Sequence, residues 1–152
     1  MEPALDPTAE SQLLTVWVVD DNPTDVFVIR EVLMASGLNL RIRIARDGQE
    51  ALQYYREMDR EDRSPCPALI LLDLNLPKVA GFEVLRELRS GLRCNRTPVI
   101  VITSSSSDGD RVMARRLGAD EYFQKPADLA AYSELETIVR RVLGAAQQSQ
   151  EA

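Results

Sequence analysis

The chain has 152 residues, of which 45% are hydrophobic and 28% are charged, and this length and composition suit one globular domain with a sizeable core. Its formal net charge of -6 argues against nucleic acid as a partner, and no apolar run approaches the roughly 20 residues that a membrane-spanning helix needs. The absence of histidine excludes hydrolases with a histidine base, most zinc sites and a role as a phosphohistidine carrier.

The first predicted strand and helix follow an N-terminal extension. Residues 1–12 are polar and contain proline without any periodicity, so we expect them to be flexible. The apolar run 13–19 predicts a buried strand that ends at residues 20–23, Asp-Asp-Asn-Pro. The asparagine suits a helix N-cap and the proline suits the first helical position. A helix therefore begins here, and we expect it to end before Gly37.

Four further strands are predicted in the rest of the chain. Residues 40–45 alternate between apolar and arginine side chains, as in a half-exposed strand at the edge of a sheet. The run 68–72 is short, apolar and bounded by prolines, which is typical of a strand buried on both faces of a parallel sheet. The last two strands are expected over 98–103 and 121–124. Helices are expected after these four strands over 48–55, 82–90, 111–117 and 129–143.

Five strands that each precede a helix predict an α/β fold with a parallel sheet, helices on both of its faces and right-handed crossovers. We assign one domain to residues 13–146 and a flexible tail to residues 147–152. The segment 56–67 between the second helix and the third strand is expected to be a charged loop.

Polar side chains end four of the five strands. Asp20 and Asp21 end the first strand, Asp73 the third, Thr103 the fourth and Lys125 the fifth. Because the carboxyl ends of parallel strands lie at the same edge of a sheet, we expect these side chains to converge. Three carboxylates suit Mg²⁺ better than zinc, and lysine and threonine can bind phosphate oxygens. These are the parts of a phosphoryl-transfer site with an aspartyl-phosphate intermediate.

Each of these side chains also has a purely structural interpretation. Asp20 and Asp21 can begin a helix, where acids interact well with the helix dipole, and Asp73 can form an Asx turn. Thr103 is a common kind of strand end, and a lysine before a proline, such as Lys125, is usually solvated. Their expected convergence at one edge favours the functional interpretation.

In their order and spacing, these residues resemble the receiver domains of two-component response regulators. The resemblance covers about residues 13–145. It rests on Asp20-Asp21, Leu-Leu-Asp73, Leu76-Pro77, Gly81, Thr103-Ser104 and Lys125-Pro126. The segments 20–25, 76–81 and 103–110 look most like the single-domain receivers that are paired with bacterial phytochromes. The resemblance implies a flavodoxin-like, doubly wound (βα)5 fold with strand order 2-1-3-4-5.

The resemblance also implies a metal and phosphate chemistry. Asp73 would accept phosphate from a phosphohistidine on a sensor histidine kinase, for example a bacteriophytochrome. Asp20, Asp21, Asp73 and the backbone carbonyl of Asn75 would bind Mg²⁺. Asn75 also occupies a position that tunes phosphoryl lifetime in the family.

A switch is implied around the fourth and fifth strands. Thr103 and Lys125 would bind the phosphoryl group, and Thr103 would then move inward together with Tyr122. The Lys125–Pro126 bond would be cis. The face formed by the fourth helix, the fifth strand and the last helix would be the readout surface, through which we expect a homodimer.

Three functional hypotheses follow. The first is a phosphorylation-controlled signalling switch that is not an enzyme. The second is a metal-dependent phosphatase with an aspartate nucleophile, but such an enzyme needs a second acid where this chain has Asn75. The third is a degenerate receiver that acts as a scaffold, which the intact set of five residues argues against.

The cysteines and the N-terminus bear on the compartment. The first residues lack the basic region and the apolar stretch of a secretory signal, so we expect a cytoplasmic protein. Cys66 and Cys94 have no metal-type spacing, and we expect both thiols to be reduced.

Overall fold

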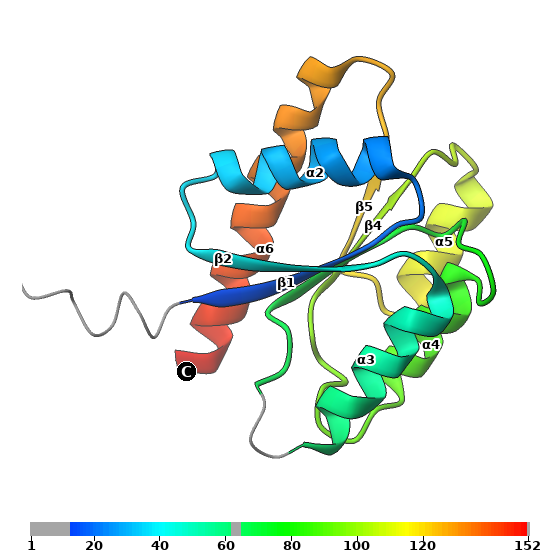
Figure 1. Ribbon diagram of the computed structural model, residues 1–152, viewed down its shortest axis with the longest axis vertical. Coiled ribbons are helices and arrows are strands. Elements are labelled where there is room, and N and C mark those ends of the chain that lie inside the picture. Colours follow the sequence, from blue (N-terminus) through cyan, green and yellow to red (C-terminus); the bar gives the residue numbers. More distant parts are fainter. Residues whose placement is uncertain (1–12, 62–64, 152) are drawn as a thin grey trace, which may run out of the picture.

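The computed structural model describes residues 13–61 and 65–151, and it shows a central parallel sheet between two layers of helices (Figure 1). The strands are β1 (Leu14–Val19), β2 (Leu40–Ala45), β3 (Leu69–Leu72), β4 (Val99–Thr103) and β5 (Glu121–Gln124). All pairs are parallel, in the order β2-β1-β3-β4-β5, which confirms the predicted doubly wound fold. The predicted extension, residues 1–12, lies outside the described residues.

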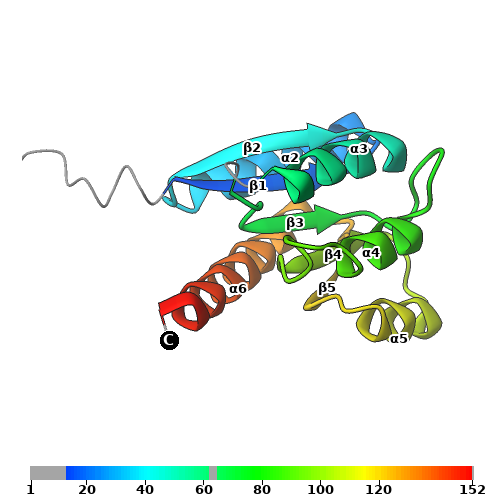
Figure 2. The ribbon, with the colours of Figure 1, turned by 90° about the horizontal axis from the view of Figure 1, so that it is seen from below.

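The helices cover both faces of the sheet. They are α2 (Pro23–Ala35), α3 (Gly48–Arg60), α4 (Gly81–Arg89), α5 (Asp108–Arg116), the 3₁₀ helix η1 (Leu129–Tyr132) and α6 (Ser133–Glu151). Figures 1 and 2 show α2 and α6 on one face and α3, α4 and α5 on the other. In the described part of the chain, no helix combines the length and the apolar character needed to cross a membrane.

The strand alternation explains how the sheet joins both helical layers. Val16 and Val18 of β1 pack in the core cluster that contains residues of α2 and α6. Trp17 and Val19 point the other way, into the cluster that contains residues of α3 and α4. All four side chains are at most 1% exposed, because successive residues of a strand face opposite sides and both sides are covered.

Strand register places the acidic residues next to each other. Val19 of β1 is paired with Leu72 of β3, so the residues that follow them, Asp20 and Asp73, leave neighbouring strands at the same level. The backbone N–H of Asp73 donates to the carbonyl of Val19 over 3.0 Å. Both acids therefore emerge together at the carboxyl edge of the sheet.

Three helices differ from the sequence expectation, and one of them, α5, begins at Asp108 rather than at residue 111. Helix α3 continues to Arg60, so the first part of the expected loop 56–67 is helical. Its extra turn contains arginine, glutamate and methionine, which favour helices even without an apolar pattern. The expected last helix is divided into η1 and α6, and α6 extends to Glu151, beyond the apolar pattern that ends at Leu143. Whether residues 147–152 are flexible stays a prediction.

The expectation of two free thiols is wrong. Cys66 and Cys94 form a disulfide, with their Cα atoms 5.5 Å apart. The register of the sheet explains the contact, since Ile70 of β3 pairs with Val99 of β4 and the cysteines lie in the segments that lead into these strands. Sequence spacing alone gave no sign of it, because the two segments come together only when β3 and β4 pair.

Candidate functional site

Three carboxylates gather where β1 and β3 end. Carboxylate oxygens of Asp20, Asp21 and Asp73 all lie within 4.8 Å of one another. Asp20 and Asp73 are buried, at 2% and 5% exposure, whereas Asp21 is exposed. Turns after the strands fix the buried pair: the N–H of Asn22 donates to Asp20 Oδ1 and the N–H of Asn75 donates to Asp73 Oδ1, each over 3.0 Å.

Lys125, directly after β5, reaches across to these acids. Its Nζ lies 2.8 Å from Asp20 Oδ2, 2.7 Å from Asp25 Oδ2 and 2.8 Å from Asp73 Oδ2. Burial disfavours the charged form of Lys125, but the three carboxylates outweigh burial and raise the pKa of its ammonium group. The lysine is therefore charged at neutral pH, and it offsets part of the repulsion among the acids.

The electrostatic balance of the cluster is nevertheless unfavourable for anions. Burial is the main cause that raises the pKa of Asp20, against the lowering effect of Lys125 and of the Asn22 N–H. Asp20 Oδ2 is buried without a hydrogen bond, and its contact with Lys125 is an ion pair. Four carboxylates around one ammonium group leave a net negative charge, so the cluster suits a further cation.

Thr103 ends β4 beside this cluster and is fully buried. Its Oγ1 accepts hydrogen bonds from the Asn75 side-chain amide, over 3.4 Å, and from the N–H of Ser105, over 3.3 Å. The backbone N–H of Lys125 donates to the Thr103 carbonyl over 2.7 Å. The loop after β4 is thus linked both to the turn after Asp73 and to the end of β5.

Tyr122 lies half-buried on β5. Its hydroxyl donates to the carbonyl of Ser105 over 3.1 Å, and the Arg111 guanidinium lies 4.4 Å from its ring centroid. The tyrosine therefore connects the loop after Thr103 to α5.

Comparison with known proteins decides the family. The protein-family model called response regulator receiver domain matches residues 16–137, which is most of the chain. The chain belongs to this family. This receiver domain is 36% identical over 114 residues to the response regulator Rcp1 of Synechocystis sp., covering 75% of this chain and 78% of Rcp1.

Solved structures of other receivers show the same fold. The phosphorylated cyanobacterial phytochrome response regulator RcpA has a TM-score of 0.75 and 34% identity, covering 84% of this chain and 91% of RcpA. The receiver domain of the sensor histidine kinase PA1611 from Pseudomonas aeruginosa has a TM-score of 0.69 and 30% identity, covering 87% of this chain and 98% of its own. That structure has a magnesium ion in its active-site cleft.

The structure agrees with the expected grouping of the site residues but not with the expected cis peptide bond. The structure brings Asp20, Asp21, Asp73 and Lys125 together, and it places Thr103 beside Asn75. The expected cis bond before Pro126 is wrong, since no peptide bond between described residues is cis. A trans bond needs no special cause, because it is favoured by about 0.5–1 kcal/mol even before proline.

Sequence reasoning missed the role of Asp25 as the third partner of Lys125. Asp25 lies in the first turn of α2, where the Asn22 side chain accepts its backbone N–H over 3.1 Å. The available signal was the N-cap itself, which fixes the turn that carries Asp25 next to the carboxyl end of β1. The direction of the side chain toward Lys125 depends on how α2 packs, which local pattern does not give.

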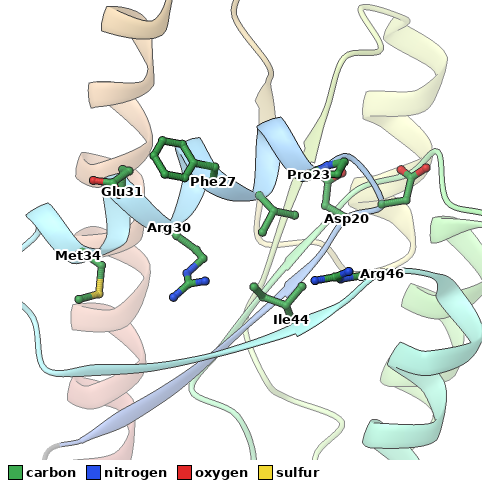
Figure 3. A pocket seen from close by; sticks show the side chains of 10 residues that line it. Asp20, Pro23, Phe27, Arg30, Glu31, Met34, Ile44 and Arg46 are labelled. Carbon is green, nitrogen blue, oxygen red and sulfur yellow. The ribbon is translucent and has the colours of Figure 1, made fainter.

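A groove borders the carboxylates between α2 and β2 (Figure 3). It has a volume of about 490 Å³, and Asp20 and Asp21 form one end of it. Phe27 and Met34 line the groove from α2 and are 63% and 65% exposed. Large apolar side chains this exposed beside a functional site are suited to contact with another protein.

Proposed function

We propose that this receiver domain is a phosphorylation-controlled switch in which Asp73 accepts a phosphoryl group. The observation that carries the proposal is the position of Asp73, whose Oδ2 lies 2.8 Å from Lys125 Nζ inside a cluster of three carboxylates. A carboxylate in such a place can act as a nucleophile, and the ammonium group beside it can bind the phosphate oxygens. The phosphatase alternative is disfavoured by Asn75, an amide where a second acid would be needed.

In the proposed step, an oxygen of Asp73 attacks the phosphorus of a phosphohistidine. An O–P bond forms and the P–N bond breaks, and the imidazole leaves with the electron pair of that bond. Lys125 binds an oxygen of the transferred group, and the Thr103 hydroxyl can donate to another. These 152 residues contain no histidine, so the phosphohistidine donor lies outside them.

We propose that the site holds Mg²⁺, bound by Asp20, Asp21 and Asp73 with the backbone carbonyl of Asn75. The donor set supports this, since it consists of hard oxygens and includes a buried Asp20 oxygen without a hydrogen bond. When bound, the ion would offset negative charge on the phosphoryl group and on the acids. The magnesium in the similar PA1611 receiver supports the choice of metal.

The proposed partner is a sensor histidine kinase. The similarity to the phytochrome response regulator RcpA supports the proposal that this kinase is a phytochrome. The groove between α2 and β2 is the surface on which we expect it to dock, since Phe27 and Met34 are exposed there beside Asp20. We also propose a homodimer through α5, β5 and α6. Val112 and Met113 of α5 support it, because they are 51% and 42% exposed.

We propose that the protein is cytoplasmic and needs no nucleic acid for its switching. The Cys66–Cys94 disulfide argues against this placement, because thiols in the cytosol are normally kept reduced. Blocking of free thiols in intact cells tests the placement. Two blocked cysteines would support the cytoplasm, and none would contradict it.

Sedimentation with and without phosphate on Asp73 tests the dimer, and a monomer under both conditions would refute it.

Labelling by phosphoramidate, a small phosphodonor, tests the central proposal. With Mg²⁺, intact-mass measurement should show the addition of one phosphoryl group to the wild-type chain and none to Asp73→Asn. Labelling that persists in Asp73→Asn would overturn the assignment of the acceptor. Repeated turnover of a phosphate ester would favour the phosphatase instead.

A further inference from the structure

Three carboxylates surround the ammonium group of Lys125, and two of them, Asp25 and Asp73, accept its hydrogen bonds. It carries three N–H donors, and three carboxylate oxygens lie around it at 2.7–2.8 Å, one each from Asp20, Asp25 and Asp73. The lysine side chain is only 9% exposed, so water has little access to it. A phosphoryl group on Asp73 that binds Lys125 must therefore compete with these carboxylates for the ammonium group.

Asp25 differs from the other two partners of Lys125. It lies outside the group of carboxylates whose oxygens fall within 4.8 Å of one another, which consists of Asp20, Asp21 and Asp73. Its side chain is 25% exposed, compared with 2% for Asp20 and 6% for Asp73. A cation bound by that group would draw Asp20 and Asp73 away from the lysine and would leave Asp25 as its remaining partner.

The local structure holds Asp25 in this position. The Asn22 side chain accepts the N–H groups of Thr24 and Asp25 at the start of α2, over 2.9 and 3.1 Å. The backbone N–H of Asn22 in turn donates to Asp20 Oδ1. The helix dipole also favours a carboxylate in the first turn. Asp25 is thus a fixed anion on the α2 side of Lys125.

We propose that Asp25 is a positioning residue that retains the Lys125 ammonium and competes with the incoming phosphoryl group for it, so that it slows phosphorylation of Asp73. This inference rests on the proposed function and adds a residue that restrains it. Asp25 contributes one negative charge in contact with the same nitrogen that must donate hydrogen bonds to the phosphoryl oxygens. Removal of that charge favours the approach of an anionic donor and weakens the attraction for a divalent cation.

The reaction used for the test is transfer from phosphoramidate. An Asp73 oxygen forms a bond to phosphorus, the P–N bond breaks, and ammonia leaves with the electron pair of that bond. The rate constant is measured at saturating Mg²⁺ for the wild type and for Asp25→Asn. Mg²⁺ affinity is measured separately by calorimetry on the unphosphorylated protein, which requires no turnover.

The expected result is a pair of opposite effects. Asp25→Asn should be phosphorylated roughly fivefold faster and should bind Mg²⁺ a few-fold more weakly, because one charge has been removed beside Lys125. Asp25→Glu keeps the carboxylate and should stay near the wild type in both measurements. Glu57→Gln is the control, since it removes an exposed acid from α3, away from the groove, and should change neither.

Several outcomes would overturn the inference. A purely structural role for Asp25 predicts that Asp25→Asn is both slower and weaker in Mg²⁺ binding, and a bystander predicts no change in either. If Asp25→Asn unfolds, Asp25→Ser takes its place under the same criteria. A wild-type protein that is not labelled at all, or labelling that survives in Asp73→Asn, would instead refute the proposed function, so the two failures are distinguishable.

Discussion

Lys125 Nζ lies 2.8 Å from Asp73 Oδ2, although the two residues are 52 positions apart in the chain. Both side chains are less than 10% exposed, so this is a buried ion pair in a sheet that delivers its members from β3 and β5. Buried charges of this kind cost folding free energy unless each has a partner. The stability of the site therefore depends on charge balance, which a metal can change.

Lys125→Met tests this balance. Without divalent cations, we expect the variant to lose about 3–5 kcal/mol of unfolding free energy, because buried carboxylates lose their cation. Saturating Mg²⁺ should stabilise the variant more than the wild type, since the ion no longer competes with an ammonium group. Denaturant unfolding with and without Mg²⁺ measures both effects. Arg56→Met, which breaks an exposed pair with Glu87, should cost much less than Lys125→Met. An equal gain from Mg²⁺ in variant and wild type would contradict the prediction.

Gly81→Ala tests how tightly the backbone after Asp73 is packed. A Cβ at Gly81 would lie 2.4 Å from the Asp73 carbonyl oxygen and 2.6 Å from Leu74 Cα, and neither backbone atom can move freely. We expect a loss of about 1–3 kcal/mol of unfolding free energy and slower labelling of Asp73, since the turn must shift.

Gly109→Ala in α5 is the control. Its Cβ would meet only the Ser107 hydroxyl at 3.4 Å, so it should be neutral or slightly stabilising. Unchanged stability and labelling in Gly81→Ala would show that the turn is plastic.

The parts of the fold that the sequence predicts are those with a local cause. Apolar runs define the strands, and the arginines of 40–45 correctly indicate an edge strand. Asp73 directly follows a fully buried run, and this position alone predicts that it lies at the carboxyl edge of the sheet. Strand ends converge by topology alone, so Asp20 and Lys125 could be assigned to the same site.

What the sequence did not predict depends on packing between distant segments. The side-chain direction of Asp25 requires the position of α2 over the sheet, and the disulfide requires the pairing of β3 with β4. The end of α3 was missed because Asp59 makes its contacts with the loop after α4 rather than with an apolar face. These features have no periodic signal within their own segment.

Asp59→Asn tests one of these distant contacts through its pH dependence. The Asp59 carboxylate accepts the N–H groups of Leu92, Arg93 and Cys94 at 2.7–2.8 Å. Burial acts to raise the pKa of Asp59, but these hydrogen bonds outweigh it and hold the pKa below the ordinary value of 3.8. A lowered pKa stabilises the fold above pH 4, and this contribution is lost as the pH falls through the folded value.

We therefore expect Asp59→Asn to lose about 1–3 kcal/mol of unfolding free energy at pH 7, because an amide cannot accept all three bonds. The difference from the wild type should shrink as the pH falls below about 4, because the unfolded wild-type chain binds a proton at Asp59 there while the folded carboxylate is still ionised. Denaturant titrations at several pH values measure it. Glu57→Gln, an exposed acid on the same helix, should show a small effect that does not follow this pattern. A loss in Asp59→Asn that is the same at all pH values would contradict the assignment.

Removal of the Cys66–Cys94 disulfide should destabilise the protein without altering its site. The bond closes a loop with a sequence separation of 28, and the chain-entropy model gives a stabilisation of about 3.5 kcal/mol for that length. We expect Cys66→Ala/Cys94→Ala and the reduced wild type to unfold at similar, lower denaturant concentrations than the oxidised wild type. Labelling of Asp73 should stay unchanged, because the disulfide precedes β3 and β4 whereas Asp73 follows β3. A reductant that leaves the wild-type unfolding curve unchanged would contradict the stabilising role, and slower labelling of the reduced protein would show that the two ends of the sheet are coupled.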